Sequence, residues 1–206
     1  MKKIIILSLL FVVIPLFTCY SQDSKEKIYD ELVKIYKYVT TVSFDFKLLE
    51  ENFSGSLTVK KGNKYKMEIG GRIIISNGKT IWNYSPKENK VVISDLEEIG
   101  DQVSLESFFF SFLENFQPVK LTEKKTSKGI EAYVLDLKVK ENTKSFQKIS
   151  TVEIWIDRGT YDIIQFHINE PQQMTWHIEK LRLRKKASNS IFDFQPNEDC
   201  TIVDLR

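Results

Sequence analysis

Apolar and polar residues alternate along much of this chain, and a period of two admits few structures other than β-strands. Phe44 and Phe46 alternate with polar neighbours, as do Leu57 and Val59 a little further on. The same alternation recurs in segments 64–69, 133–139, 152–156, 164–168 and 174–183. Because successive side chains of a strand point to opposite faces, each segment is predicted to be a half-buried antiparallel strand with one apolar face.

Short turns separate several of these segments. Asn77-Gly78 joins residues 72–76 to residues 79–84, and both turn residues accept the positive φ angles of a type I′ hairpin. Gly62-Asn63 supplies a second turn. About ten or eleven strands linked in this way predict a mainly β (α+β) fold, an incomplete and strongly curved antiparallel β-barrel.

Two stretches have the period of an α-helix instead. Residues 24–39 form an amphipathic pattern, and Asp23 and Glu26 are placed as its capping box. In residues 104–116, SLESFFFSFLENF, only Phe110 interrupts an apolar stripe at helical spacing. The members of this stripe are Leu105, Phe108, Phe109, Phe112, Leu113 and Phe116. We expect both helices to lie on the concave face of the curved sheet.

The aromatic stripe has two interpretations. The helix can fill the sheet as part of a solid core, or it can act as a lid over a cavity that holds an apolar ligand. Both arrangements bury the same helix face, so the spacing does not separate them. Trp82 and Tyr84 share one face of their strand, and they are open in the same way between core packing and cavity lining.

Residues 1–21 have the features of a secretory signal peptide. Two lysines precede the apolar run 4–17, which is too short for a membrane anchor, and small residues follow before a cleavage site at Gln22. The segment Leu16 to Cys19 offers the alternative of a lipobox, in which Cys19 carries a lipid. Either way we expect an exported chain, with residues 22–206 as one domain.

Charge excludes some classes of partner. Loss of residues 1–21 removes two of the 30 basic residues, which leaves 28 basic residues against 28 acidic ones. Zero net charge argues against a nucleic-acid partner and gives no general attraction to anionic membranes. The basic run Lys180–Lys186 fits either a solvated strand edge or a docking patch for an acidic partner.

Residues suited to catalysis or metal binding do not gather in this sequence. The two histidines lie on separate predicted strands, outside any HExxH motif. Residues 95–106 resemble a calcium loop with Glu106 at the twelfth position, but Ile99 stands where an oxygen ligand is needed. Cys200 follows two acidic residues, which disfavour its thiolate. We therefore expect no enzyme activity, no metal and no cofactor.

Three segments resemble the periplasmic outer-membrane lipoprotein carrier proteins, the LolA family. They are LTVKKGNKYKMEI (57–69), IIISNGKTIWNYSPKENKVV (73–92) and FDFQPNEDCTIVDL (192–205). The family pattern has a strand ending in two basic residues, a hairpin similar to SDGKTLWxY, and a tail of the form FxFxP…VxD. The resemblance implies an unclosed β-barrel with an α-helical lid, and between them an apolar cavity for the acyl chains of lipoproteins carried across the periplasm.

On this resemblance, the apolar side chains of the sheet and the aromatic helix become the cavity wall. The residues expected to line it are Phe44, Phe46, Leu57, Val59, Tyr65, Met67, Ile69, Trp82, Tyr84, Leu105, Phe108, Phe109, Phe112, Leu113 and Phe116. The implied partners of this monomer are an inner-membrane lipoprotein-releasing complex and an outer-membrane acceptor. The alternatives are a carrier of another lipid and a protein-binding module with a solid core.

Lys61 departs from the family pattern. The second basic residue of that strand is usually an arginine before proline, whereas here Lys61 precedes Gly62. In the family the arginine bonds to the lid and keeps it closed. Lysine has no planar fork of donors, so we expect a latch at Lys61 to be weaker or absent, the alternative being a lysine at a hairpin end that reaches back to water.

Overall fold

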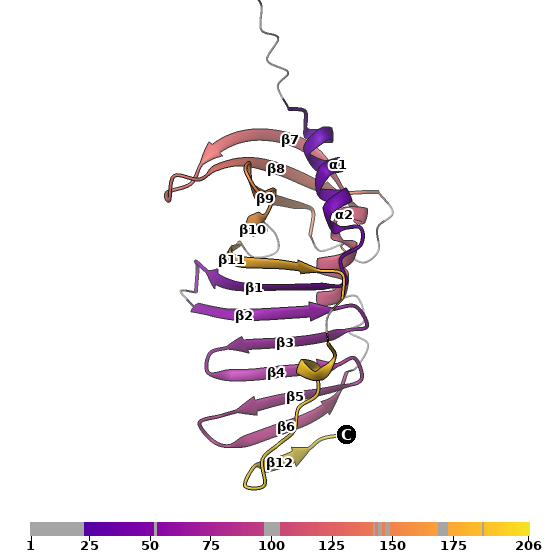
Figure 1. Ribbon diagram of the computed structural model, residues 1–206, viewed down its shortest axis with the longest axis vertical. Helices are drawn as coiled ribbons and strands as arrows, with labels where there is room; N and C mark the ends of the chain where they lie inside the picture. The colour runs from indigo at the N-terminus through magenta and orange to yellow at the C-terminus, as the bar shows by residue number, and fades with distance from the viewer. Residues whose placement is uncertain are drawn as a thin grey trace, which may run out of the picture.

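The computed structural model describes residues 23–51, 53–96, 104–141, 143, 146, 149–168, 173–186 and 188–206. The predicted signal peptide, its cleavage site and the lipidation alternative at Cys19 lie outside these residues. Within the described part, the chain is mostly β-strand, and twelve strands make one sheet (Figure 1).

The strands follow one another mainly as hairpins. In chain order they are β1 (Thr41–Leu48), β2 (Phe53–Lys60), β3 (Lys64–Ile69), β4 (Arg72–Asn77), β5 (Thr80–Ser85), β6 (Lys90–Asp95), β7 (Phe116–Lys125), β8 (Glu131–Val139), β9 (Thr151–Asp157), β10 (Ile163–Ile168), β11 (Met174–Arg184) and β12 (Thr201–Asp204). Their order across the sheet is β12-β6-β5-β4-β3-β2-β1-β11-β10-β9-β8-β7. Two hairpin series, β1–β6 and β7–β11, therefore join through the pairing of β1 with β11.

The sheet curls but does not close. Its edges are β7 and β12, and Figure 1 shows them at opposite ends of the molecule. All neighbouring strands are antiparallel except β12, which runs parallel to β6. The predicted open, strongly curved antiparallel sheet is confirmed, and the two strands added to the prediction are β7 and β12.

The helices are shorter than the sequence patterns indicated. They are α1 (Lys25–Tyr36), the π-helix η1 (Ser107–Ser111), α2 (Phe112–Asn115) and the 3₁₀-helix η2 (Ser190–Phe192). The N-cap of α1 is Ser24, whose hydroxyl accepts a hydrogen bond from the Lys27 N–H at 3.1 Å. The expected capping box is therefore wrong, and Asp23 instead accepts hydrogen bonds from the Lys27 ammonium and the Tyr133 hydroxyl.

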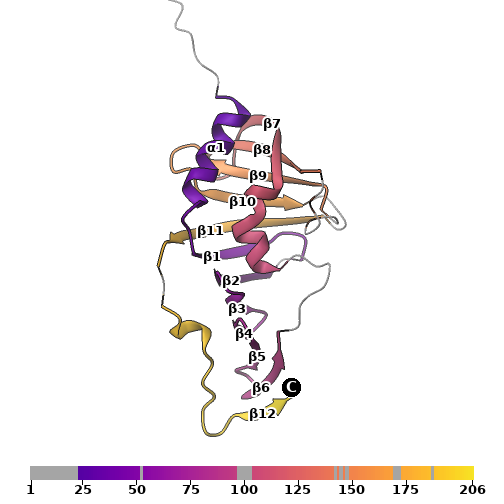
Figure 2. The same cartoon turned by 90° about the vertical axis from the view of Figure 1, so that its right-hand side faces the viewer.

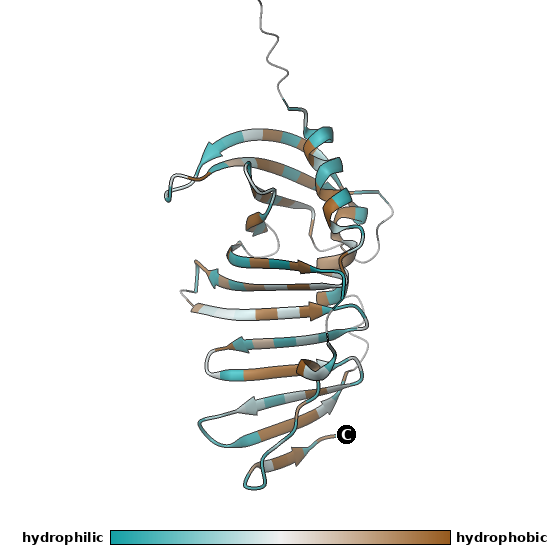
Figure 3. Ribbon diagram, viewed as in Figure 1, coloured by the Kyte–Doolittle hydropathy of each residue, from teal (hydrophilic) through white to brown (hydrophobic). Residues whose placement is uncertain are grey.

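Strand register assigns the apolar residues to faces. Phe44 pairs with Leu57, Leu57 with Met67, and Met67 with Ile74, so these side chains form one row on the inner face. Figure 3 shows apolar and polar residues following each other along the strands, as this arrangement requires. The inner faces of β1, β2 and β8–β10 carry fully buried residues such as Leu135, and α1 adds its buried face to this core.

A smaller apolar layer lies on the opposite face of β3–β5. Ile75 pairs with Trp82 there, and Phe192 of η2 is fully buried against β3 and β4. The ring of Phe194 lies 5.0 Å from that of Tyr84. Figure 2 shows this C-terminal segment, in yellow, running beside β3–β6 before it adds β12 to the sheet edge. The FxFxP tail therefore covers the outer face of the sheet.

Gly78 lets two hairpin turns touch. Its φ is +95°, and a Cβ atom added there would lie 2.2 Å from the carbonyl oxygen of Gly62. We expect Gly78→Ala to lower the free energy of unfolding by about 2 kcal/mol or more, because it adds a clash to the cost of a left-handed alanine. Urea unfolding followed by circular dichroism measures this change.

Gly71→Ala is the matched control for that prediction. Gly71 has a φ of +73°, and no atom lies within 4 Å of the place its Cβ would take. It should therefore lose only the conformational part, about 1 kcal/mol. Equal losses in the two variants would show that the contact between the turns contributes nothing.

Candidate functional site

Two adjoining apolar cavities lie between the inner face of the sheet and the helical segment from Leu105 to Asn115, which we name the lid. The first, of about 240 Å³, reaches the surface beside α1 and is named the mouth chamber. The second, of about 220 Å³, is open to a similar degree, is lined only by apolar residues, and is named the inner chamber for that lining. An apolar volume of this kind suits a hydrocarbon ligand, since dry apolar cavities bind apolar molecules.

Aromatic side chains stand between the two chambers. Phe44, Phe108, Phe109 and Phe166 line both of them, together with Ile178. The ring of Phe109 lies 5.3 Å from that of Phe44, and the ring of Phe108 lies 5.7 Å from that of Phe166. We name these four rings the partition. A ligand longer than one chamber would therefore run past these rings.

The structure brings together about half of the residues expected to line the cavity. Those that line a chamber are Phe44, Leu57, Leu105, Phe108, Phe109, Phe112 and Leu113, and Lys61 lies at the mouth. Others lie in the surrounding core or against it without lining either chamber: Phe46, Val59, Tyr65, Met67, Ile69 and Phe116.

Trp82 and Tyr84 lie elsewhere. Trp82 pairs with Ile75 and Tyr84 packs on Phe194, so both face away from the chambers, on the side covered by the C-terminal segment. The expectation that these two side chains line the cavity is therefore wrong. Their side chains project from the face of the sheet opposite to that of Leu57 and Met67, and only the strand register shows this.

Several lining residues were not foreseen. Ile163, Phe166, Ile178 and Leu181 come from β10 and β11, and Val33 and Tyr36 come from α1. The alternation in residues 164–183 marked these strands as half-buried. Nothing in their spacing indicated that β11 would pair with β1 and so place them opposite the lid.

A π-helical turn shapes the lid. The five residues Ser107–Ser111 form this turn, and an ordinary α-helical turn from Phe112 to Asn115 follows. A π-turn holds an additional residue per turn, which accounts for the break that Phe110 makes in the apolar stripe. The Phe110 ring lies at the mouth chamber, 5.6 Å from the ammonium of Lys61.

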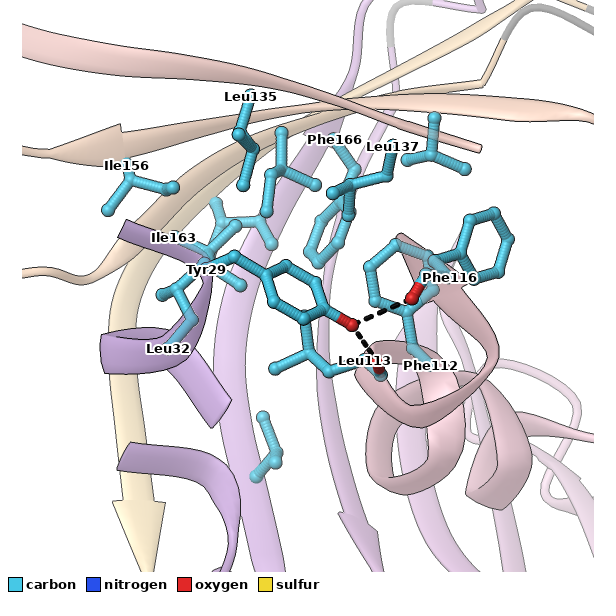
Figure 4. Packing of buried hydrophobic residues seen from close by; sticks show 14 of the residues in the cluster. Tyr29, Leu32, Phe112, Leu113, Phe116, Leu135, Leu137, Ile156, Ile163 and Phe166 are labelled. Carbon is cyan, nitrogen blue, oxygen red and sulfur yellow. Dashed lines mark hydrogen bonds between the residues drawn. The ribbon is translucent and has the colours of Figure 1, made fainter. Parts of the chain in front are cut away.

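The C-terminal end of the lid is fixed in the core. The hydroxyl of Tyr29 donates to the carbonyl oxygens of Leu113 and of Phe116, the latter at 2.8 Å, which satisfies acceptors left free where the helix ends (Figure 4). Burial raises the pKa of Tyr29 to about 12, so the proton stays on the hydroxyl. The rings of Phe112 and Phe116 stack 4.5 Å apart, and Phe146 packs against Phe116 at 5.2 Å.

The N-terminal end of the lid is held at the surface by one carboxylate. Glu106 accepts hydrogen bonds from the backbone N–H groups of Gly62, at 3.0 Å, and Asn63, at 2.5 Å. Both turn residues have positive φ, +92° and +54°, so their N–H groups converge on a concave site for an anion. The sequence marked Glu106 only as a member of a discounted calcium loop, and its role in fastening the lid was missed.

The mouth carries the polar groups of the site. Lys37, Lys61 and Glu114 line it, whereas the inner chamber has no charged side chain. Within the described residues, no three side chains of His, Cys, Asp or Glu come close enough together to hold a metal ion. Among those same residues, no helix has the length and apolar character needed to cross a membrane.

An open, curled sheet with a helical lid over apolar chambers defines a carrier or binding protein in general terms. The chain belongs to the family of outer membrane lipoprotein carrier proteins, LolA, whose model matches residues 40–195. Members of this family are carriers, not enzymes.

Individual relatives are more distant. An uncharacterized protein of Methanocaldococcus jannaschii is 28% identical over 98% of this chain, which spans 60% of that protein's length. An uncharacterized conserved protein from Thermus thermophilus has the same fold, with a TM-score of 0.51 and 14% identity over 88% of this chain and 99% of that one. A putative outer membrane lipoprotein-sorting protein domain from Vibrio parahaemolyticus gives a TM-score of 0.42 and 13% identity over 82% of this chain and 97% of that one.

The unequal fastening of the lid leads to a prediction. In Glu106→Gln the charge of the acceptor is lost, and about 1 kcal/mol of the lid's attachment should go with it. Hydrogen exchange at residues 105–111 should then become about fivefold faster, while α1 keeps its protection. Exchange measured by mass spectrometry resolves the two regions.

Glu114→Gln serves as the control, because Glu114 lies on the same helix and its carboxylate does not contact the Gly62 turn. It should leave the exchange of residues 105–111 unchanged. Lys61→Leu tests the expected second latch in the same assay. If Glu106→Gln leaves exchange at the wild-type rate, the carboxylate does not hold the lid.

Proposed function

We propose that this protein is an exported periplasmic carrier that holds the acyl chains of lipoproteins in the two chambers and shuttles them from the inner to the outer membrane. It receives them from a lipoprotein-releasing complex and gives them to an outer-membrane acceptor. The observation that supports this most directly is the pair of apolar chambers beneath a lid that is held by the core at its C-terminal end and by Glu106 alone at its N-terminal end. A protein-binding module with a solid core is not expected to contain apolar cavities of this size.

The size of the chambers agrees with this cargo. A methylene group takes about the volume of a water molecule in the liquid, roughly 30 Å³. On that scale each chamber, at about 240 and 220 Å³, holds seven or eight methylenes. One common acyl chain therefore needs both chambers, and runs past the rings of the partition to fill the second.

Other parts of the proposal concern export and the lid. Residues 1–21 act as the signal peptide, and residues 22–206 form the carrier domain. Lys61, whose ammonium lies over the Phe110 ring, acts with Glu106 to hold the lid over the empty cavity. A cation over a ring contributes less than a buried arginine that donates to carbonyls, so the lid of this protein opens readily.

We expect the protein of residues 22–206 to bind fluorescent fatty-acyl probes one to one. Burial of each CH₂ contributes about 0.8 kcal/mol, so affinity should rise roughly tenfold for every two carbons added. The rise should continue from C8 to C16, because C8 fills about one chamber and longer chains must enter the second. Fluorescence titration gives the affinities, and native mass spectrometry gives the stoichiometry.

Two outcomes would contradict this prediction. A response that is flat from C8 to C16 would leave the chambers as packing defects of a solid core. Tight binding of free lipids together with failure to accept a triacylated lipopeptide would favour the carrier of another lipid.

Acidic substitutions should distinguish a residue of the partition, which affects binding, from a residue of the core, which affects stability. Phe109 is half-buried between the chambers, so Phe109→Glu should abolish acyl binding with little loss of stability, because its carboxylate can keep some water. Phe112 is 4% exposed and packs on Phe116, so Phe112→Glu should lower the free energy of unfolding by several kcal/mol. Circular dichroism melts and probe binding measure the two effects. Collapse of the fold in Phe109→Glu would favour a solid core.

A further inference from the structure

The rim of the mouth chamber carries an exposed aromatic residue between two lysines. Tyr38 lies in the turn between α1 and β1 and is 63% exposed. The ammonium of Lys37 lies 5.5 Å from its ring centroid and that of Lys185 lies 5.8 Å away. Thr40 fixes this arrangement: its backbone N–H donates to the carbonyl oxygen of Arg184, and its hydroxyl donates to that of Lys185, each at 2.9 Å.

These positive charges are not balanced locally. Among the residues that the structure describes, neither Lys37 nor Lys185 has a carboxylate within ion-pair distance. Lys37 also lines the mouth, where Lys61 adds a further cation and Glu114 is the one acidic side chain. The nearby Lys34 is paired with Glu31 at 2.7 Å and is therefore largely neutralised.

Apolar surface accompanies the charge. Ile35 is 39% exposed on the last turn of α1, a few residues before Tyr38. Tyrosine has an apolar ring with a polar tip, which suits the interface between water and lipid, and lysine can extend its ammonium toward headgroups while its stem stays near apolar surface. We name Ile35, Lys37, Tyr38 and Lys185 the rim patch.

We propose that the rim patch docks the mouth of the cavity onto membrane surfaces that contain anionic lipids. Lysines and an exposed tyrosine next to an opening into apolar chambers match a layer of acidic headgroups above hydrocarbon. An acidic protein partner would be better recognised by arginines with fixed bidentate geometry, and the patch itself contains none. The inference goes beyond the proposed function and rests on it only in that cargo enters and leaves through this mouth.

The patch is local, because the chain without residues 1–21 has as many acidic as basic residues. Attraction to an anionic surface falls off within about 8–10 Å at physiological salt, so charges at the rim act while those at the far end of the sheet do not. Each lysine that reaches an anionic membrane surface strengthens binding by roughly fivefold at low salt. Loss of both rim lysines should weaken it by about 25-fold.

Sedimentation with vesicles tests the proposal. The wild-type protein, without cargo, should bind phosphatidylcholine vesicles that contain phosphatidylglycerol and not vesicles of phosphatidylcholine alone, and added salt should release it. The double variant Lys37→Gln with Lys185→Gln should lose about 25-fold in binding. Tyr38→Ser should also bind the vesicles more weakly. The factor by which binding falls should be the same at low and at high salt, because the contribution of the ring is apolar. Thermal melts confirm that each variant is folded.

The matched control changes two lysines of the hairpin formed by β5 and β6, Lys87→Gln with Lys90→Gln, which removes the same charge far from the mouth. It should bind as the wild type does. Three outcomes would overturn the proposal. The control could lose as much binding as the rim variant, or the wild-type protein could bind both kinds of vesicle equally. The third is that the wild-type protein binds no vesicles and binds an acidic protein instead. Acyl-probe binding in solution is measured on the same samples, so a failure of docking is distinguished from a failure of the carrier function.

Discussion

An open curled sheet exposes an apolar inner face that its own strands cannot cover. In this protein β7 and β12 remain unpaired with each other, so the inner face cannot be sealed by closing a barrel. Two helices cover it instead, and rings as large as those of Phe108 and Phe109 touch the sheet at a few points without filling the space between. The chambers follow from this mismatch between a curved sheet and a short helix with bulky side chains.

The way the lid is attached decides which of its ends can move. At its C-terminal end, Tyr29 and the rings around Phe116 form a dry, densely packed anchor. At its N-terminal end, Glu106 makes two hydrogen bonds at the surface, where water competes for both partners. A π-turn, a rare single-turn departure from the α-helix, lies between these ends. The attachment at Glu106 is therefore the weaker of the two.

Local periodicity predicted most of the strands and the aromatic helix, but it could not predict which strands pair with each other. The alternation around Phe44 and Leu57 placed both residues on the inner face, as the register confirms. Strand β7 was missed because Pro118 and the bulge after it break the alternation, and β12 because it has four residues with none buried. The side of the sheet on which Trp82 lies is set by the hairpin at Asn77-Gly78, because the hairpin fixes which residues of β4 and β5 pair. The contact of Glu106 with a turn 43 residues away has no local signal.

The free energy of burying the proposed acyl cargo is much larger than that of the bonds that hold the lid. Burial of fourteen methylenes contributes on the order of 11 kcal/mol before the costs of ordering the chain and moving the partition. The surface bonds of Glu106 contribute on the order of 1–2 kcal/mol in total. Such a fastening cannot set the affinity for a long acyl chain, but it is large enough to keep the empty lid closed most of the time. In the proposed carrier, retention would then depend on chain length, whereas the rate of loading would depend on Glu106, Lys61 and the surface against which the mouth rests.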